Sequence, residues 1–220
     1  MYLKLFQYAQ LISLVFAICY FKGLKQWYIA AFLPLIVLIV VIEIIGTNYK
    51  VFNWPNNYFV YNFYLLLSPP LWLYLFQRML DLSGTALLIF RAIGVLCMTF
   101  ILINFIWGEG FRRFNSWSLL LLMLLTIVFS CLILFRLSAS DNVTGSLFKH
   151  PYFWINAGNL LFSLVTLVLL GLQPYIRYFD LEIHQKSLYC AIIPTANIIL
   201  YTSYCYGFYL CRVPLTRLPL

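Results

Sequence analysis

The sequence is a succession of apolar stretches, each long enough to cross a membrane, with short polar or Gly/Pro-containing segments between them. A helix needs about 20 apolar residues to cross roughly 30 Å of hydrocarbon. Seven stretches along the 220 residues are candidates. They predict membrane-spanning helices at 5–21, 27–46, 58–79, 84–107, 117–138, 152–173 and 186–211.

The composition agrees with a membrane-embedded chain. Apolar residues make up 64% of the sequence and charged residues 9%, whereas about a quarter of the residues in a soluble domain are charged. Roughly 70 residues remain outside the seven stretches, which is too few for a separate soluble domain. We therefore predict an all-α, polytopic, seven-helix bundle that forms one transmembrane domain over residues 1–220.

The first stretch is short and carries Gln7 and Gln10. The alternative for such a segment is a cleaved signal peptide, which needs small residues just before the cleavage site. The sequence Phe16-Ala17-Ile18-Cys19 does not provide that pattern. We expect a membrane span.

The basic residues suggest an orientation. An odd number of spans places the two ends of the chain on opposite sides, with six Lys and Arg residues on the amino-terminal side and seven on the other, or eight with Arg91. The positive-inside rule then favours an outside amino terminus and a cytoplasmic carboxy terminus.

The net charge of +8 suits contact with the anionic headgroups of a lipid bilayer. Nucleic acid is not an expected partner, because no domain presents a basic cluster.

Polar residues within apolar stretches tend to face the interior of a bundle or a cavity. The sixth stretch has such residues at helical spacing on one face, and they are Asn156, Asn159, Ser163 and Thr166. In the seventh stretch Asn197, Tyr201 and Tyr204 share a face. Pro69-Pro70 and Pro194 should bend their helices. Interrupted helices line binding sites in transporters, but a bend can also have a purely structural role. The prolines are therefore consistent with either a binding site or a structural bend.

Two charged residues lie inside the predicted spans. Arg91 is about 10 Å deep, at a depth comparable to Asn159 and Asn197. These three could form a cluster that binds an anionic group, or Arg91 could simply extend to the interface. Glu43 lies near the opposite end of its span, where Tyr61, Asn62 and Asn104 could solvate it or share its proton. The candidate ligand-binding residues are Glu43, Tyr61, Asn62, Arg91, Asn156, Asn159, Asn197 and Tyr201.

The chain has few groups for catalysis. It contains two His and six acidic residues, and none of the common nucleotide-binding, metalloprotease or nucleophile motifs. Asp180 and His184 have a spacing that could hold a metal, although a hydrated loop is the simpler interpretation. We predict no catalytic residue, metal, cofactor or disulfide. The tryptophans at the ends of stretches, Trp27, Trp54, Trp107 and Trp117, are expected in the membrane interface.

Several short motifs occur together: Glu43-Ile-Ile-Gly46, Asn57 with Tyr61-Asn62, His150-Pro151 with Phe153-Trp154-Ile155, and Asn197-Ile-Ile-Leu-Tyr201. With these motifs the chain resembles a group of small bacterial seven-span integral membrane proteins of no established activity. Members of that group often lie beside sensor histidine kinases or response regulators. The resemblance implies the bacterial inner membrane as location and a membrane sensor kinase or other membrane protein as partner.

Three functional hypotheses follow. The first is a non-catalytic receptor-like or accessory protein that senses a ligand or lipid, or partners another membrane protein in signalling. The second is a small-molecule or lipid transporter, favoured by the prolines and the polar stripe but not by any repeat of the two halves. The third is an intramembrane enzyme that uses Glu43 or the Asp180/His184 segment.

Overall fold

The structure, a computed structural model, describes residues 4–139, 147–178 and 182–213, with side chains described outside 173–190. These residues form eight α-helices and two short 3-10 helices, and no strand occurs among them, which confirms the predicted all-α class. The long helices are α1 (Leu5–Cys19), α3 (Phe32–Thr47), α4 (Tyr58–Leu80), α5 (Gly84–Trp107), α6 (Ser116–Ala139), α7 (Pro151–Tyr178) and α8 (Glu182–Leu210). The short ones are α2 (Phe21–Gln26), η1 (Tyr49–Phe52) and η2 (Leu147–Lys149).

Four of the helices are long and apolar enough to cross a membrane, namely α4, α5, α6 and the part of α7 from Pro151 to Leu172. Helices α1 and α3 are also apolar, but with 15 and 16 residues they are shorter than the about 20 residues of a typical span. The chain thus has the helices of an integral membrane protein.

The breaks between helices follow local backbone chemistry. Helix α5 has the predicted limits, and its start follows positive φ angles of 45° at Asp81, which ends α4, and 56° at Gly84, its own first residue. Asp and Gly tolerate this left-handed conformation better than other residues. Helix α3 begins at Phe32 rather than at residue 27, because the chain turns at Tyr28, where φ is 58°.

Trp27, which precedes that turn, lies in the interior of the protein. Its side chain is 1% exposed, and its indole nitrogen donates to the carbonyl of Val213 at 3.1 Å. The Tyr152 hydroxyl in turn donates to the carbonyl of Trp27. A buried indole needs such an acceptor, and here the acceptor comes from the segment after α8. Trp54, Trp107 and Trp117 are exposed, as an interfacial position requires.

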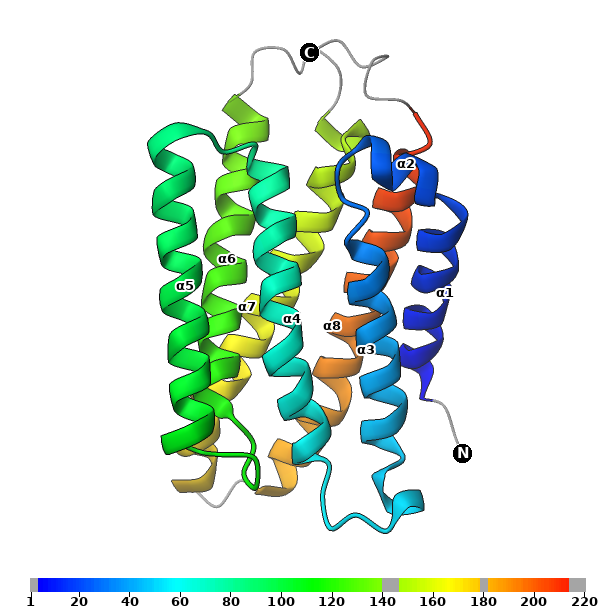
Figure 1. Ribbon diagram of the computed structural model, residues 1–220. Coiled ribbons are helices and arrows are strands. Elements are labelled where there is room, and N and C mark those ends of the chain that lie inside the picture. The colour runs from blue at the N-terminus through cyan, green and yellow to red at the C-terminus, as the bar shows by residue number, and fades with distance from the viewer. Residues whose placement is uncertain (1–3, 140–146, 179–181, 214–220) are drawn as a thin grey trace.

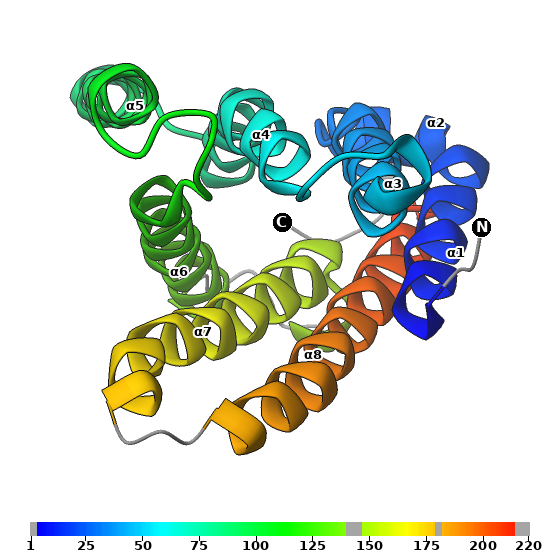
Figure 2. The same cartoon turned by 90° about the horizontal axis from the view of Figure 1, so that it is seen from below.

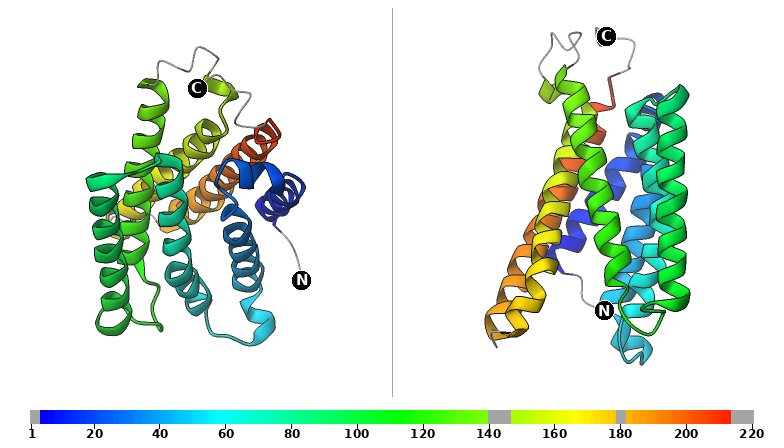
Figure 3. Two further views of the ribbon diagram at one scale, coloured as in Figure 1. Left: turned by 45° about the horizontal axis from the view of Figure 1, so that its top comes forward. Right: turned by 90° about the vertical axis from the view of Figure 1, so that its left-hand side faces the viewer.

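The long helices run alternately up and down, so that α1 begins at the lower end of the bundle and α8 finishes at the upper end (Figure 1). Seen from below, α3, α4, α6, α7 and α8 surround a central space, while α1 lies outside between α3 and α8 and α5 lies outside beside α4 and α6 (Figure 2). Helices α7 and α8 lean away from α4 and α5 toward the lower end (Figure 3).

Close packing of α7 on α8 depends on small residues. A Cβ at Gly158 would lie 2.9 Å from the Cβ of Ser203, and one at Gly207 would lie 2.8 Å from the side chain of Ile155. Both distances are shorter than a normal carbon contact of about 3.5–4.0 Å. The two glycines therefore let the helix backbones approach, as small residues do in membrane helix pairs.

Helix α1 is an integral part of the bundle. Its two glutamines, Gln7 and Gln10, are each 1% exposed. Gln7 donates to the Thr47 hydroxyl at 2.9 Å, and Gln10 donates to the Tyr201 hydroxyl at 3.3 Å. These bonds tie α1 to α3 and α8 and satisfy amides that lipid would leave unpaired.

Candidate functional site

A cavity of about 220 Å³ lies inside the ring of helices. It is larger than the about 150 Å³ cavity that holds benzene in an engineered protein core, and we call it the intrabundle cavity. Its wall comes from five helices and one loop: Ile39, Ile42 and Glu43 of α3; Tyr61, Tyr64, Leu65 and Trp72 of α4; Phe114; Leu119, Met123 and Thr126 of α6; Asn159, Phe162, Ser163 and Thr166 of α7; Ile193, Asn197, Leu200, Tyr201 and Tyr204 of α8.

Glu43 and Tyr61 form a hydrogen-bonded pair on this wall. The Tyr61 hydroxyl donates to Oε2 of Glu43 at 3.1 Å, which confirms that Tyr61 lies deep enough to solvate the carboxyl. The ring of Tyr61 packs against Gly46, one turn after Glu43 on α3. A Cβ at position 46 would lie 3.0 Å from that ring, so glycine is what lets α3 and α4 approach here.

The opposite wall carries a second polar pair, on α7 and α8. The Tyr204 hydroxyl donates to Oδ1 of Asn159. The Asn159 side chain is 2% exposed, and its Nδ2 has no hydrogen-bond partner in the described part of the chain. The Thr166 hydroxyl, also on the wall, likewise has none there. A buried donor without a partner costs about 1–3 kcal/mol, so two residues that line the cavity have unused hydrogen-bonding capacity.

The polar stripe predicted on α7 is confirmed. Asn159, Ser163 and Thr166 line the cavity. Asn156 is buried on the same side but does not line it, because its Nδ2 donates to the Tyr152 carbonyl at 2.8 Å and contacts the Met79 sulfur at 3.4 Å. The shared face predicted for α8 is also confirmed, because Asn197, Tyr201 and Tyr204 all line the cavity.

Asn62 does not line the cavity and does not solvate Glu43. Its Nδ2 donates to the Arg113 carbonyl at 2.8 Å, and its Oδ1 accepts from the Asn115 backbone N–H at 3.0 Å. Asn104 likewise bonds Asn115 and Ser118 near the start of α6. Both amides therefore hold the α5–α6 loop.

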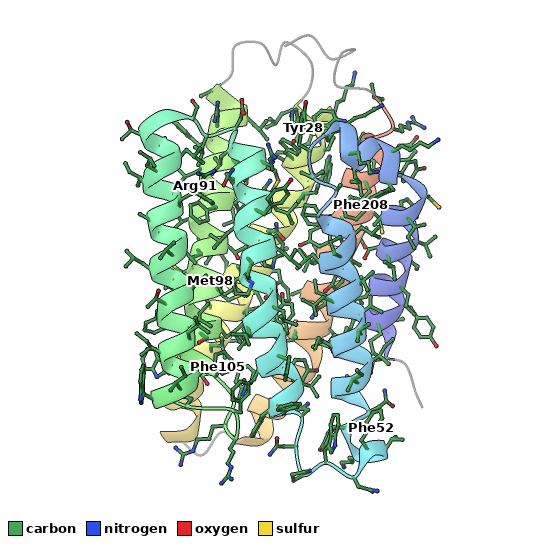
Figure 4. The ribbon with its side chains drawn as sticks, viewed as in Figure 1. Tyr28, Phe52, Arg91, Met98, Phe105 and Phe208 are labelled. Atoms are coloured by element: carbon green, nitrogen blue, oxygen red, sulfur yellow. The ribbon has the colours of Figure 1, made fainter. Side chains whose placement is uncertain are left out.

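Arg91 lies apart from the cavity. It is exposed on α5, the helix outside the ring, and Figure 4 shows it in the upper half of that helix, above Met98 and Phe105. The three-residue cluster that it could have formed with Asn159 and Asn197 is therefore absent. An exposed Arg at this position is compatible with extension to the headgroups.

Several aromatic residues of the wall were not among the sequence candidates. Tyr64, Trp72 and Phe162 line the cavity, but in an apolar helix nothing distinguishes a cavity-facing ring from a lipid-facing one. Their only signal is helical spacing from polar residues: Phe162 lies three residues after Asn159, and Tyr64 three after Tyr61.

Metal binding has little support in the described part of the chain, where no group of three or more His, Cys, Asp or Glu residues could hold an ion. The Asp180/His184 pair lies outside the described side chains.

Comparison with known proteins gave no match: no family model, no curated protein and no solved structure is similar to this chain. The interpretation of the site therefore depends on its geometry.

Proposed function

We propose that this chain is a seven-span integral membrane protein that binds a small ligand in the intrabundle cavity and acts as a non-catalytic receptor-like or accessory protein. The observation that carries the proposal is the unpartnered Nδ2 of Asn159, a buried donor on the wall of an about 220 Å³ cavity. Ligand sites are concave and mostly apolar, with a few polar groups that orient the ligand.

The seven-span arrangement is favoured by the buried amides of α1 and by the length of α8. With 29 residues, α8 is about 43 Å long at 1.5 Å per residue, which exceeds the hydrocarbon thickness. Helix α3 forms part of the cavity wall, α1 packs against α3 and α8, and the short α2 and η1 extend the chain beyond their ends (Figure 1).

We place the protein in the bacterial inner membrane with the carboxy terminus in the cytoplasm. The small excess of basic residues on that side supports this orientation, and the resemblance to bacterial seven-span proteins supports the location. A sensor kinase or another membrane protein is the proposed partner. Chemical cross-linking in native membranes, followed by mass spectrometry of purified complexes, should identify it.

The ligand-binding proposal is tested by filling the cavity. Thr166→Phe places a ring in the cavity and removes a hydroxyl that has no described partner. Thr99→Phe is the matched control, because Thr99 is exposed on the outer helix α5. Molecules retained by each purified protein are identified by native mass spectrometry. We expect a small molecule on the wild type and on Thr99→Phe that is lost from Thr166→Phe. Equal retention by all three proteins would contradict the proposal.

A transporter is the second candidate, and one observation favours it. Pro69 of α4 and Pro194 of α8 lie within the two helices that also supply much of the cavity wall. Proline removes a helix hydrogen bond and allows local bending. Ligand flux across proteoliposomes, compared with vesicles without protein, distinguishes transport from binding alone.

A further inference from the structure

The wall of the intrabundle cavity carries an acidic group but no basic group among its described residues. Glu43 is the only ionisable carboxyl among the described lining residues, and no Lys, Arg or His stands beside it there. Lys4 acts on Glu43 electrostatically, but it is exposed at the start of α1, and Glu43 makes no ion pair with any described residue. A partly buried carboxylate without a counter-charge is costly.

Glu43 also has unused hydrogen-bonding capacity. Oε2 accepts from Tyr61, but Oε1 has no hydrogen bond from the described chain. A carboxylate can accept several hydrogen bonds. It is therefore able to receive a donor from a molecule in the cavity without losing the bond to Tyr61.

Aromatic rings make up much of the remaining wall. Seven of the lining residues are aromatic, and they come from α4, the α5–α6 loop, α7 and α8: Tyr61, Tyr64, Trp72, Phe114, Phe162, Tyr201 and Tyr204. Rings around a cavity with one carboxylate are the chemistry that attracts an organic cation, because their π faces add to the attraction of the acid.

From this wall we infer that the ligand is a small organic cation with an apolar or aromatic body, such as a protonated amine, whose charged end lies at Glu43. The inference rests on the proposed function, because it names the ligand class for the same cavity. Asn159, across the cavity, offers its free Nδ2 as a donor to an acceptor on the body of such a ligand.

The test uses three probes of nearly the same shape: benzylamine, which is protonated at pH 7, neutral benzyl alcohol and anionic benzoate. Binding of radiolabelled benzylamine to the full chain in detergent is measured by equilibrium dialysis, with the other two as competitors. The variants are Glu43→Gln and, as a charge-matched control, Asp81→Asn. Asp81 caps α4 with φ 45°, a conformation that Asn also tolerates, and it does not line the cavity.

We expect wild type and Asp81→Asn to bind benzylamine equally, Glu43→Gln to bind it at least tenfold more weakly, and neither competitor to displace it. Displacement by benzyl alcohol, together with unchanged binding by Glu43→Gln, would overturn the inference and leave ligand binding intact. Absence of benzylamine binding to wild type would also overturn it, and the retention experiment above would then decide the proposed function separately.

Tyr61→Phe is a control that separates a structural role of Glu43 from a role in ligand binding. It removes the described hydrogen bond to the carboxyl but keeps the ring and the acid, so benzylamine affinity should stay within about threefold of wild type. A loss as large as that in Glu43→Gln would show that the pair maintains the cavity rather than binding the ligand, and would refute the inference.

Discussion

Replacing Gly46 with Ala should displace Tyr61 and destabilise the wall between α3 and α4. The new Cβ would lie 3.0 Å from Cζ, 3.1 Å from Cε2 and 3.2 Å from the hydroxyl oxygen of Tyr61. Carbon atoms pack best at about 3.5–4.0 Å, so the ring or the helix must move by a few tenths of an ångström. That movement also strains the 3.1 Å bond from Tyr61 to Glu43.

The expected cost has three parts. Overpacking costs typically 1–3 kcal/mol, and loss of the hydrogen bond adds about 0.5–1.5 kcal/mol. The higher helix propensity of Ala offsets up to about 1 kcal/mol, and less than that near the last turn of α3. The net destabilisation should be about 1–3 kcal/mol, which lowers Tm by several degrees in a chain of this size.

Thermal unfolding of the purified protein in detergent measures this effect. Gly171→Ala is the matched control, because a Cβ on Gly171 of α7 would meet nothing within 4 Å; its Tm should stay the same or rise. In a Tyr61→Leu background, Gly46→Ala should lose most of its cost, as a double-mutant cycle would show. If Gly46→Ala raised Tm as Gly171→Ala does, Tyr61 would not lie against Gly46 and the described wall would be wrong.

Two further predictions concern the ends of the bundle. Asn62→Ala removes the hydrogen bonds to the Arg113 carbonyl and the Asn115 N–H. It should lower the free energy of unfolding by about 2–3 kcal/mol and speed trypsin cleavage at Arg113. Cleavage at the wild-type rate would contradict the role of Asn62 in holding the loop. Burial lowers the pKa of His150 to about 4, below its value of about 6.5 in an unfolded chain. The folded protein therefore binds fewer protons than the unfolded chain between these values. Stability should be full above pH 6.5 and fall by up to about 3 kcal/mol as the pH drops toward 4. Tm measured at pH 7.5 and pH 5 should show this fall in wild type and less of it in His150→Gln; equal slopes would assign the effect to another group.

The helices could be predicted from sequence where turn residues separate them. Gly84 and Gly108 flank α5, and its predicted limits are those observed. The start of α3 could not be predicted in the same way, because residues 27–31 contain no charged residue, Gly or Pro that would mark a turn. The turn there depends on Trp27, whose indole and carbonyl bond to Val213 and Tyr152, more than 120 residues away along the chain.

The depth of a residue in the membrane can be estimated from its position along a helix, but its direction around the bundle cannot. Arg91 and Asn159 are at comparable predicted depths, yet α5 lies outside the ring and α7 lies within it (Figure 2). Which helices are neighbours depends on small residues such as Gly158 and Gly207, where two backbones approach. Such glycines carry no polarity, so a search for polar groups does not find them.

The contrast between Asn62 and Asn159 shows what distinguishes a structural amide from a candidate binding group. Both are asparagines on long helices, with side chains 0% and 2% exposed, and both are candidate binding residues by sequence. Asn62 uses its Nδ2 and its Oδ1 on the backbone of one loop, so a ligand would have to break existing bonds to reach it. Asn159 uses its oxygen on Tyr204 and keeps its Nδ2 free of any described partner. A buried donor left in this way lowers the cost of binding an acceptor, because its desolvation has already occurred on folding.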